Sequence, residues 1–266
     1  MTLSSRSQQM PRVELFGIRI DNVTMPEALE RVRRLLAGPG RHIVVTPNVD
    51  HVVRLSRDEA FRWAYGRASL VVADGMPLVW ASRLLGHPLK ARVTGSDMVP
   101  QVCRLAEEGG YPIYLLGAMP GVAEEAIRRL RRRHPSLRIV GHYAPPVGFE
   151  RDAEACADIV RRINLAKPAI LLIGLGPAKQ EKWIAQHLDA LDIRMAFCIG
   201  AGIDFLAGNV ERAPVWMQRS GLEWLFRLAR EPRRLWRRYL VEDMAFLGLF
   251  LREYRRAKAR RPREAV

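Results

Sequence analysis

Short apolar runs alternate with helical stretches along most of this chain, and a loop rich in glycine, proline, asparagine or aspartate follows each run. The runs include IVV at 43–45, LVV at 70–72, YLL at 114–116 and ILLI at 170–173. Continuous apolar runs are typical of parallel strands covered on both faces, and the periodicity after each run is that of a helical crossover. The pattern predicts an α/β protein with a Rossmann-like, mainly parallel sheet and flanking helices.

The first part of the chain adds two local predictions. VELFGIRID at 13–21 is typical of a strand or a hairpin. Thr24-Met25-Pro26-Glu27 is a capping box with proline in the first helical turn, so we expect a helix to begin there. Further strands are expected within 137–149 and 193–198, where apolar residues again run into loops.

The C-terminal part has a different pattern, in which arginines alternate with tryptophan, leucine, phenylalanine and tyrosine. Residues 212–263 hold fifteen Arg or Lys against five Asp or Glu, within a chain of 266 residues whose formal net charge is +15. We expect an α/β catalytic domain over 1–210 and a short, basic, helical appendage over 211–266. Rings and guanidinium groups together suit the headgroup zone of a membrane.

The chain should bind a membrane surface rather than cross it. The apolar run AFLGLFL at 245–251 is much shorter than the roughly 20 residues that span a bilayer. The opening sequence lacks the apolar core of a signal peptide, so we expect the protein in the cytoplasm. Three scattered cysteines without CxxC spacing fit small buried side chains in a reducing compartment.

Candidate chemistry lies just after the apolar runs, because ligands of parallel α/β sheets bind at the carboxyl ends of the strands. Four such loops are polar or glycine-rich. Their candidate residues are Thr46 and Asn48, Asp74, Gly117, and the group Gly174, Gly176, Lys179 and Gln180.

The loop GLGPAKQE at 174–181 could hold a phosphate. Two glycines let the backbone approach closely, a helix begins behind them, and Lys179 adds a cation. The loop lacks the third glycine of a dinucleotide fingerprint and the GK[ST] of a Walker loop. A nucleotide diphosphate held partly by backbone amides fits it better, although a simple tight turn is the alternative.

The polar residues each have a structural alternative. Asp74 could be a general base or only the N-cap of the helix after it. Thr46 and Asn48 could bind sugar hydroxyl groups or only shape a turn. Asp50 and His51 are expected at a helix start, with the histidine solvated.

An arginine, Arg92, precedes a further helix start, where Ser96 or Asp97 is expected to be the N-cap. Arg92 itself could bind phosphate or lie on the surface. No carboxylate pair or DxD-like sequence is present to hold Mg²⁺, so arginines and backbone amides would have to neutralise a leaving diphosphate.

Several motifs together resemble the WecG/TagA/CpsF family of bacterial glycosyltransferases. In order, they are TPNVDH, ADGMPLVW, RVTGSDM, LLGA, GLGPAKQEKW, GAGIDFLAG and RAPVWMQRSGLEWLFRLAREPRRLWRRYL. The resemblance covers about residues 15–240, and the combination is specific although each motif alone is weak. The chain departs from it at PAKQE, where many relatives have proline directly before Lys-Gln-Glu.

The resemblance implies an inverting glycosyltransferase that uses neither a metal nor a cofactor. The donor would be a UDP-sugar and the acceptor a polyprenyl (undecaprenyl) diphosphate-linked saccharide at the inner face of the cytoplasmic membrane. Asp74 matches the catalytic base, and Thr46, Asn48 and Gln180 match other active-site positions. Arginines that would engage the nucleotide diphosphate or complete the site are Arg92, Arg212, Arg219 and Arg227.

Three alternatives remain open from the residues. The basic charge and interleaved rings would also suit a nucleic-acid-binding protein, although no motif of that class is present. A nicotinamide-dependent oxidoreductase could share the sheet, but the glycine fingerprint is incomplete. The appendage could instead be a partner-binding helix pair. Neither the donor sugar nor the oligomeric state can be read from the sequence.

Overall fold

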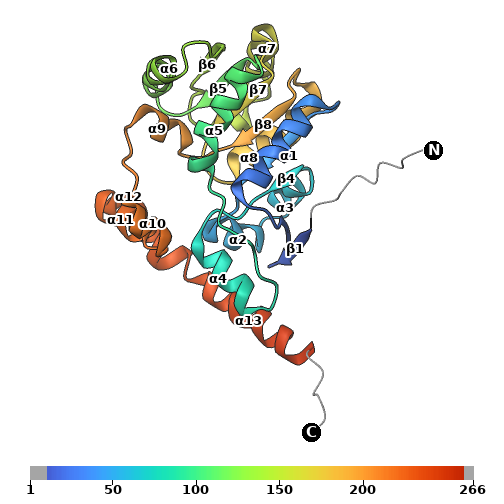
Figure 1. Cartoon of the computed structure of the whole chain (residues 1–266), viewed down its shortest axis with the longest axis vertical. Coiled ribbons are helices and arrows are strands. Elements are labelled where there is room, and N and C mark those ends of the chain that lie inside the picture. Colours follow the sequence, from blue (N-terminus) through green and yellow to red (C-terminus); the bar gives the residue numbers. More distant parts are fainter. Residues whose placement is uncertain (1–10, 261–266) are drawn as a thin grey trace, which may run out of the picture.

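A six-stranded parallel sheet forms the centre of the molecule (Figure 1). The computed structural model describes residues 11–260, apart from the side chains of Arg219 and Arg260. Neighbouring strands are parallel throughout the sheet. Their order is β4 (Leu70–Val71), β3 (His42–Val45), β8 (Met195–Cys198), β7 (Ile170–Gly174), β5 (Ile113–Gly117) and β6 (Ile139–Tyr143).

A separate hairpin precedes the sheet, as the sequence predicted for 13–21. It pairs β1 (Arg12–Leu15) with β2 (Ile18–Asp21) in antiparallel register. Asp21 accepts a hydrogen bond at 2.8 Å from the backbone of Val71 in β4, which ties the hairpin to that edge of the sheet.

Helices connect the strands and cover both faces of the sheet. The predicted capping box begins the first helix: the Thr24 backbone donates to the Glu27 carboxylate at 2.7 Å. The helices of the α/β part are α1 (Met25–Ala37), α2 (Val49–Leu55), α3 (Glu59–Gly66), α4 (Met76–Leu84), α5 (Gly95–Glu108), α6 (Val122–Arg133), η1 (Phe149–Arg151), α7 (Ala153–Ala166), α8 (Lys179–His187), η2 (Leu188–Ala190) and α9 (Gly202–Ala207).

Two hydrophobic cores lie on opposite faces of the sheet, because alternate side chains of each strand point to opposite sides. One core joins the strands to α2, α3, α7 and α8, with Trp183 and Phe61 fully buried in it. The other joins them to α1, α5, α6 and α9. The result is the three-layer α/β arrangement that the apolar runs predicted, and this prediction of fold class is confirmed.

The strand order explains where a site can form. From β3 the chain runs outward to the β4 edge, and from β5 it runs outward to the β6 edge, while β7 and β8 fill the space between. Such a change of direction leaves a crevice at the carboxyl ends of the central strands. The loops after β3, β4, β7 and β8 meet there, whereas β5 and β6 lie on the far side of β7.

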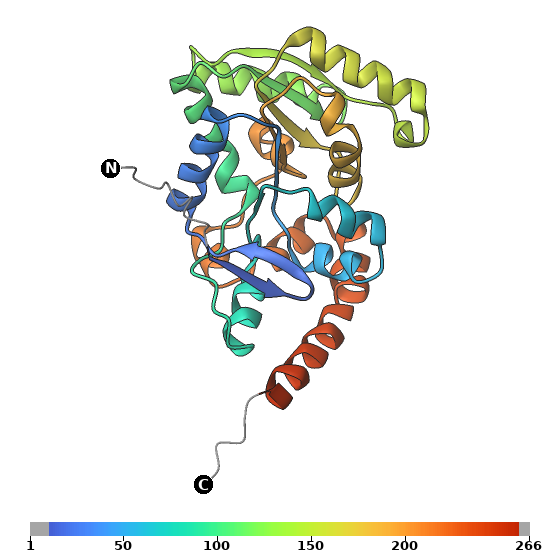
Figure 2. The same cartoon turned by 90° about the vertical axis from the view of Figure 1, so that its right-hand side faces the viewer.

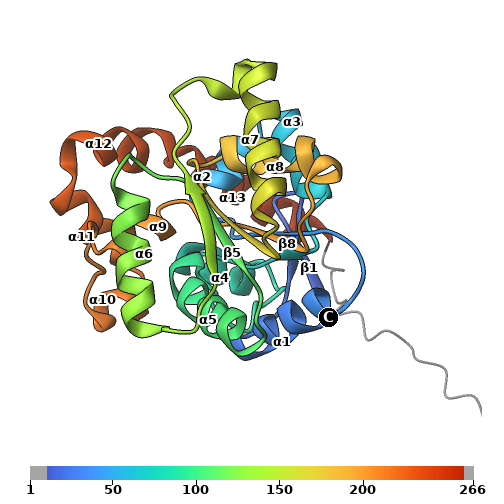
Figure 3. The same ribbon diagram turned by 90° about the horizontal axis from the view of Figure 1, so that it is seen from above.

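Residues after α9 form a set of helices with a different course. They are α10 (Val215–Arg219), α11 (Glu223–Arg230), α12 (Pro232–Arg237), η3 (Arg238–Glu242) and α13 (Ala245–Arg260). The first three lie on the same side of the molecule as α6 and α9 (Figures 1 and 3), and α13 extends beyond the α/β body (Figure 2). We call 211–260 the appendage.

The start of α13 is anchored in a core of the α/β domain. Phe246 is buried there, with its ring centroid 5.1 Å from that of Phe16 between β1 and β2. Leu249 and Phe250 pack against the same core. Between residues 11 and 260, no helix has both the length and the apolar character needed to cross a membrane.

Gly117 should be one of the least replaceable residues of the sheet. It has a φ of 110°, and a Cβ there would lie 2.3 Å from the carbonyl oxygen of Gly174. We expect Gly117→Ala to lower the free energy of unfolding by about 3 kcal/mol, because the backbone is strained and the two strand ends must separate. Urea denaturation would measure the loss.

Gly121 provides the matched control, since its φ is 84° but a Cβ there would meet no atom within 4 Å. Gly121→Ala should lose only about 1 kcal/mol, from the left-handed backbone alone. Equal losses in the two variants would contradict the close approach of β5 and β7 as the cause.

Candidate active site

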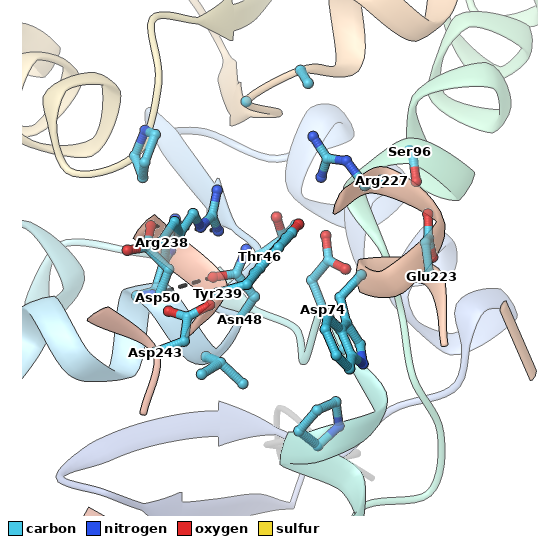
Figure 4. A pocket seen from close by; sticks show the side chains of 18 of the residues that line it. Thr46, Asn48, Asp50, Asp74, Ser96, Glu223, Arg227, Arg238, Tyr239 and Asp243 are labelled. Carbon is cyan, nitrogen blue, oxygen red and sulfur yellow. Dashed lines mark hydrogen bonds and ion pairs between the residues drawn. The ribbon is translucent and has the colours of Figure 1, made fainter. Parts of the chain in front are cut away.

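A cavity of about 660 Å³ lies between the carboxyl ends of the strands and the appendage. Its floor comes from the loops after β3, β4, β7 and β8, and its roof from α11, α12, η3 and α13. Figure 4 shows Asp74, Glu223, Ser96 and Arg227 at one end and Asp50, Arg238 and Asp243 at the other. The appendage residues that line it are Gly221, Glu223, Trp224, Arg227, Arg234, Arg238, Tyr239, Leu240, Asp243, Met244, Phe246 and Leu247.

Asp74 projects into this cavity from the end of the β4 segment. Its backbone nitrogen donates to the carbonyl of Pro47 at 2.8 Å, which ties the β4 loop to the β3 loop. Its Oδ2 accepts from the backbone nitrogen of Gly95 at 3.2 Å. The N-cap of α4 is Gly75, so the alternative in which Asp74 serves as that N-cap is wrong. Its carboxylate is available to a ligand.

The environment of Asp74 favours its protonated form. Burial is the main cause, and it raises the pKa of Asp74 from 3.8 to about 6. The negative charges of Glu223 and Asp97 raise the pKa further, while the Gly95 amide and the Arg92 guanidinium act in the opposite direction. A carboxylate whose pKa lies close to neutral is suited to accept a proton from a hydroxyl group.

The Thr46 hydroxyl and the Asp74 carboxylate both lie next to Gly95. Its side chain is mostly buried, and a Cβ placed on Gly95 would lie 3.3 Å from Thr46 Oγ1 and 3.9 Å from Asp74 Oδ2. Asn48 is the N-cap of α2, because its Oδ1 accepts from the backbone nitrogen of His51 at 3.2 Å. Its NH₂ group takes no part in that cap, and Asn48 also lines the cavity.

Gln180 connects two loops of the cavity floor. Its Oε1 accepts from the backbone nitrogen of Gly200, after β8, at 3.1 Å. Its Nε2 donates to Oε1 of Glu181 at 2.7 Å, and both side chains are buried. Burial raises the pKa of Glu181 to about 7. Gln180 therefore fixes the Gly200 loop against α8, with Glu181 orienting its amide.

The glycine loop after β7 is only partly at the cavity. Gly174 and Gly176 line it, and Gly176 has a φ of 89°. Lys179 is not among the lining residues: its ammonium group lies 3.2 Å from the Glu150 carboxylate and above the Phe149 ring. Gly117 is not among them either, because β5 lies beyond β7 from the cavity. Neither residue is therefore brought to the site for which the sequence suggested it.

The predicted arginines divide in the same way. Arg92 and Arg227 line the cavity. Arg212 does not; it pairs with Asp97 and donates to Gln218 Oε1 at 2.9 Å. Arg219 lies in α10, and its side chain is outside the described part of the chain. The N-cap of α5 is Thr94, so the expected caps Ser96 and Asp97 were both wrong.

The sequence did not identify the charged residues at the far end of the cavity. Asp50 is buried and pairs with Arg54 at 2.7 Å and with Arg238 of the appendage at 3.4 Å. His51 is buried rather than solvated: its Nδ1 is 2.6 Å from the Tyr65 hydroxyl, and burial lowers its pKa to about 4. The i, i+4 spacing of Asp50 and Arg54 was visible in the sequence, but the Arg238 contact was not.

No group of three or more histidine, cysteine, aspartate or glutamate side chains suited to hold a metal ion is assembled among residues 11–260. Hydroxyl and amide groups, backbone at glycines and four arginines converge on the cavity instead, together with five carboxylates: Asp50, Asp74, Asp204, Glu223 and Asp243. These groups form a polar cavity across the carboxyl ends of β3, β4, β7 and β8, where α/β enzymes bind their ligands.

Comparison with known protein families identifies the class of enzyme to which this chain belongs. The model of the glycosyl transferase WecG/TagA/CpsF family matches residues 13–260, and the chain belongs to this family. The protein is thus a glycosyltransferase, as the motif resemblance indicated, and the oxidoreductase alternative does not hold.

Curated relatives match along almost the whole chain. Two proteins from Staphylococcus aureus, strains MRSA252 and MW2, are each 28% identical to it over 263 residues, which is 98% of this chain and 98% of theirs. Both are described as N-acetylglucosaminyldiphosphoundecaprenol N-acetyl-beta-D-mannosaminyltransferase.

Asp74→Asn should stabilise the fold at neutral and alkaline pH. The folded carboxyl group has a pKa above its ordinary value, so its ionisation costs stability as the pH rises from about 4 to about 6. The neutral amide avoids this cost. We expect the variant to gain about 1 to 3 kcal/mol in the free energy of unfolding above pH 6, and nothing below pH 4.

Urea denaturation of both proteins at pH 4 and pH 8 would measure the difference. A gain that is equal at the two pH values would show that ionisation of Asp74 is not its cause.

Proposed function

We propose that this protein transfers a sugar from a UDP donor to a saccharide linked to undecaprenyl diphosphate, with inversion at the anomeric carbon and without a metal ion. The observation that carries the proposal is the position of Asp74 in one cavity with the Gly174–Gly176 backbone and Arg227. The names of the relatives support N-acetylmannosamine as the sugar and an N-acetylglucosaminyl lipid as the acceptor. The uronic acid of N-acetylmannosamine and glucose are the alternative donor sugars.

In the proposed reaction, Asp74 is the general base. Its carboxylate takes the proton of the acceptor hydroxyl, and the hydroxyl oxygen attacks the anomeric carbon of the donor. The bond from that carbon to the diphosphate oxygen breaks, and UDP leaves with the electron pair. One displacement at the anomeric carbon inverts its configuration. The raised pKa of Asp74 makes its carboxylate a stronger base than an exposed aspartate.

The leaving diphosphate would be stabilised by the cavity floor and the roof together. The loops at Gly174–Gly176 and Gly200 offer backbone close to a ligand, and Arg227 reaches into the cavity from α11. Guanidinium groups remain charged and offer paired donors to phosphate oxygens. Thr46 and Asn48, beside Asp74, are placed to hydrogen-bond sugar hydroxyl groups, and Gln180 holds the Gly200 loop in position.

The acceptor would reach the cavity from the inner face of the cytoplasmic membrane, to which we propose the appendage binds. Half-exposed apolar side chains recur along its last helices at Leu240, Met244, Leu247 and Leu251. Leu240, Met244 and Leu247 also line the cavity. Arginines on the same helices suit anionic headgroups. An apolar surface that runs from the lipid interface into the cavity fits a lipid-linked substrate.

Asp74→Asn should abolish most turnover without removing donor binding. We expect the rate of sugar transfer to fall by about 100- to 10,000-fold, because the general base is lost, while UDP binds with similar affinity. Mass spectrometry of the lipid product and calorimetric titration of UDP would check the two parts. The control is Asp189→Asn, an exposed carboxylate paired with Arg67. Undiminished turnover in Asp74→Asn would remove Asp74 from this role.

Val241→Gln/Leu251→Gln should weaken binding to anionic vesicles. Both side chains are about half exposed on the appendage, so replacing them removes apolar area that would enter the interface. We expect the partition coefficient to fall by about tenfold or more. The control is Val147→Gln/Leu165→Gln, two exposed residues around α7. Equal sedimentation with vesicles for both double variants would contradict the proposed membrane surface.

A further inference from the structure

Four charged side chains form a ring between the α/β domain and the appendage, which we call the Arg92 ring: Arg92, Asp97, Arg212 and Glu223. Arg92 donates to Glu223 at 2.9 Å and lies 3.8 Å from Asp97. Arg212 contacts Asp97 and lies 3.8 Å from Glu223. Guanidinium and carboxylate groups therefore alternate, and the formal charges of the ring cancel.

Only half of this ring faces the ligand. Arg92 and Glu223 line the cavity, whereas Asp97 and Arg212 are not among the lining residues. The side chains of Arg92 and Glu223 are 16% and 21% exposed. Beside Asp74, the cavity thus presents an arginine whose donors already face a carboxylate.

An anionic ligand would compete with Glu223 for Arg92. Both partners line the cavity, so a ligand that enters it can reach the Arg92 guanidinium. A diphosphate brings more negative charge and more acceptor oxygens to the same guanidinium fork. Arg227 differs from Arg92, because no carboxylate of the described residues lies within ion-pair distance of it. A diphosphate could therefore bind Arg227 first and then exchange with Glu223.

We propose that Glu223 is an exchangeable counter-ion of Arg92 and sets the affinity for the nucleotide. Its carboxylate occupies Arg92 in the free enzyme, gives way to the donor diphosphate, and returns when UDP leaves. This inference rests on the proposed UDP-sugar donor. In this proposal, competition from Glu223 keeps the binding of UDP, the product, weak enough for turnover.

Calorimetric titration of UDP into the full chain tests the exchange. Glu223→Gln keeps the shape of the side chain but removes its charge, so it should bind UDP about three- to tenfold more tightly than the unaltered protein. The gain should disappear in Glu223→Gln/Arg92→Gln, because the released guanidinium is then absent.

Asp97→Asn is the matched control. It removes a carboxylate from the same ring on the side away from the cavity, so it should not tighten UDP binding. A residue that only fastened the appendage would give the opposite result at Glu223, since its loss would loosen the roof of the cavity and weaken UDP binding.

Unchanged or weaker UDP binding by Glu223→Gln would overturn the exchange, as would an equal gain in Asp97→Asn. Loss of cooperative unfolding in Glu223→Gln would overturn it too, because the carboxylate would then be a required part of the fold. Absence of UDP binding by the unaltered protein would instead contradict the proposed donor, and the exchange with it.

Discussion

The cavity depends on the contact between the appendage and the strand ends, to which buried Phe246 and two clusters of ion pairs contribute. The Arg92 ring joins the appendage to the β4–α5 segment at one end. At the other end, buried Asp50 of α2 pairs with Arg238, and Arg54 lies 3.8 Å from Glu242. A buried carboxylate without a cation is costly, so Asp50 depends on its arginines. In the Arg92 ring, the Arg212–Asp97 contact does not involve Glu223. Residues far apart in sequence are thereby fixed as the two walls of one site.

This arrangement also decides how the positive charge of the chain acts. A formal net charge of +15 suggests a cavity full of free cations, yet most arginines near the cavity are balanced. Arg92 faces Glu223, Arg238 faces Asp50, and Arg234 lies 2.6 Å from Glu231. Neutralised walls allow Asp74 to keep a raised pKa, which a crowd of unpaired arginines would lower.

The sequence was sufficient for the sheet and for the residues at its central strand ends. Apolar runs followed by polar loops predicted the α/β fold with a mainly parallel sheet, and Thr46, Asn48, Asp74 and Gly176 do line one cavity. What it could not supply was strand order and helix rotation. Gly117 ends β5, on the far side of β7. Consecutive helical residues differ by about 100° in direction, so Gln180 faces inward while Lys179 turns to Glu150.

The partners of the charged residues were equally hidden, because ion pairs across the chain leave no local pattern. Glu223 was only one acidic residue in a basic segment, and Arg212 was grouped with cavity-facing arginines although Asp97 holds it elsewhere. Single motifs left several functions open, and only the resemblance of the combined motifs to a family indicated glycosyl transfer. The family match confirms that class, while the roles of individual residues depend on the geometry described above.

Hydrogen–deuterium exchange of the full chain, with and without UDP, would test most directly whether this cavity is the nucleotide site. The account predicts slower exchange on UDP binding at 174–180 and 199–205 in the floor and at 223–227 in the roof. Protection confined to the loop after β5, at 117–121, or no protection at these three segments, would contradict it.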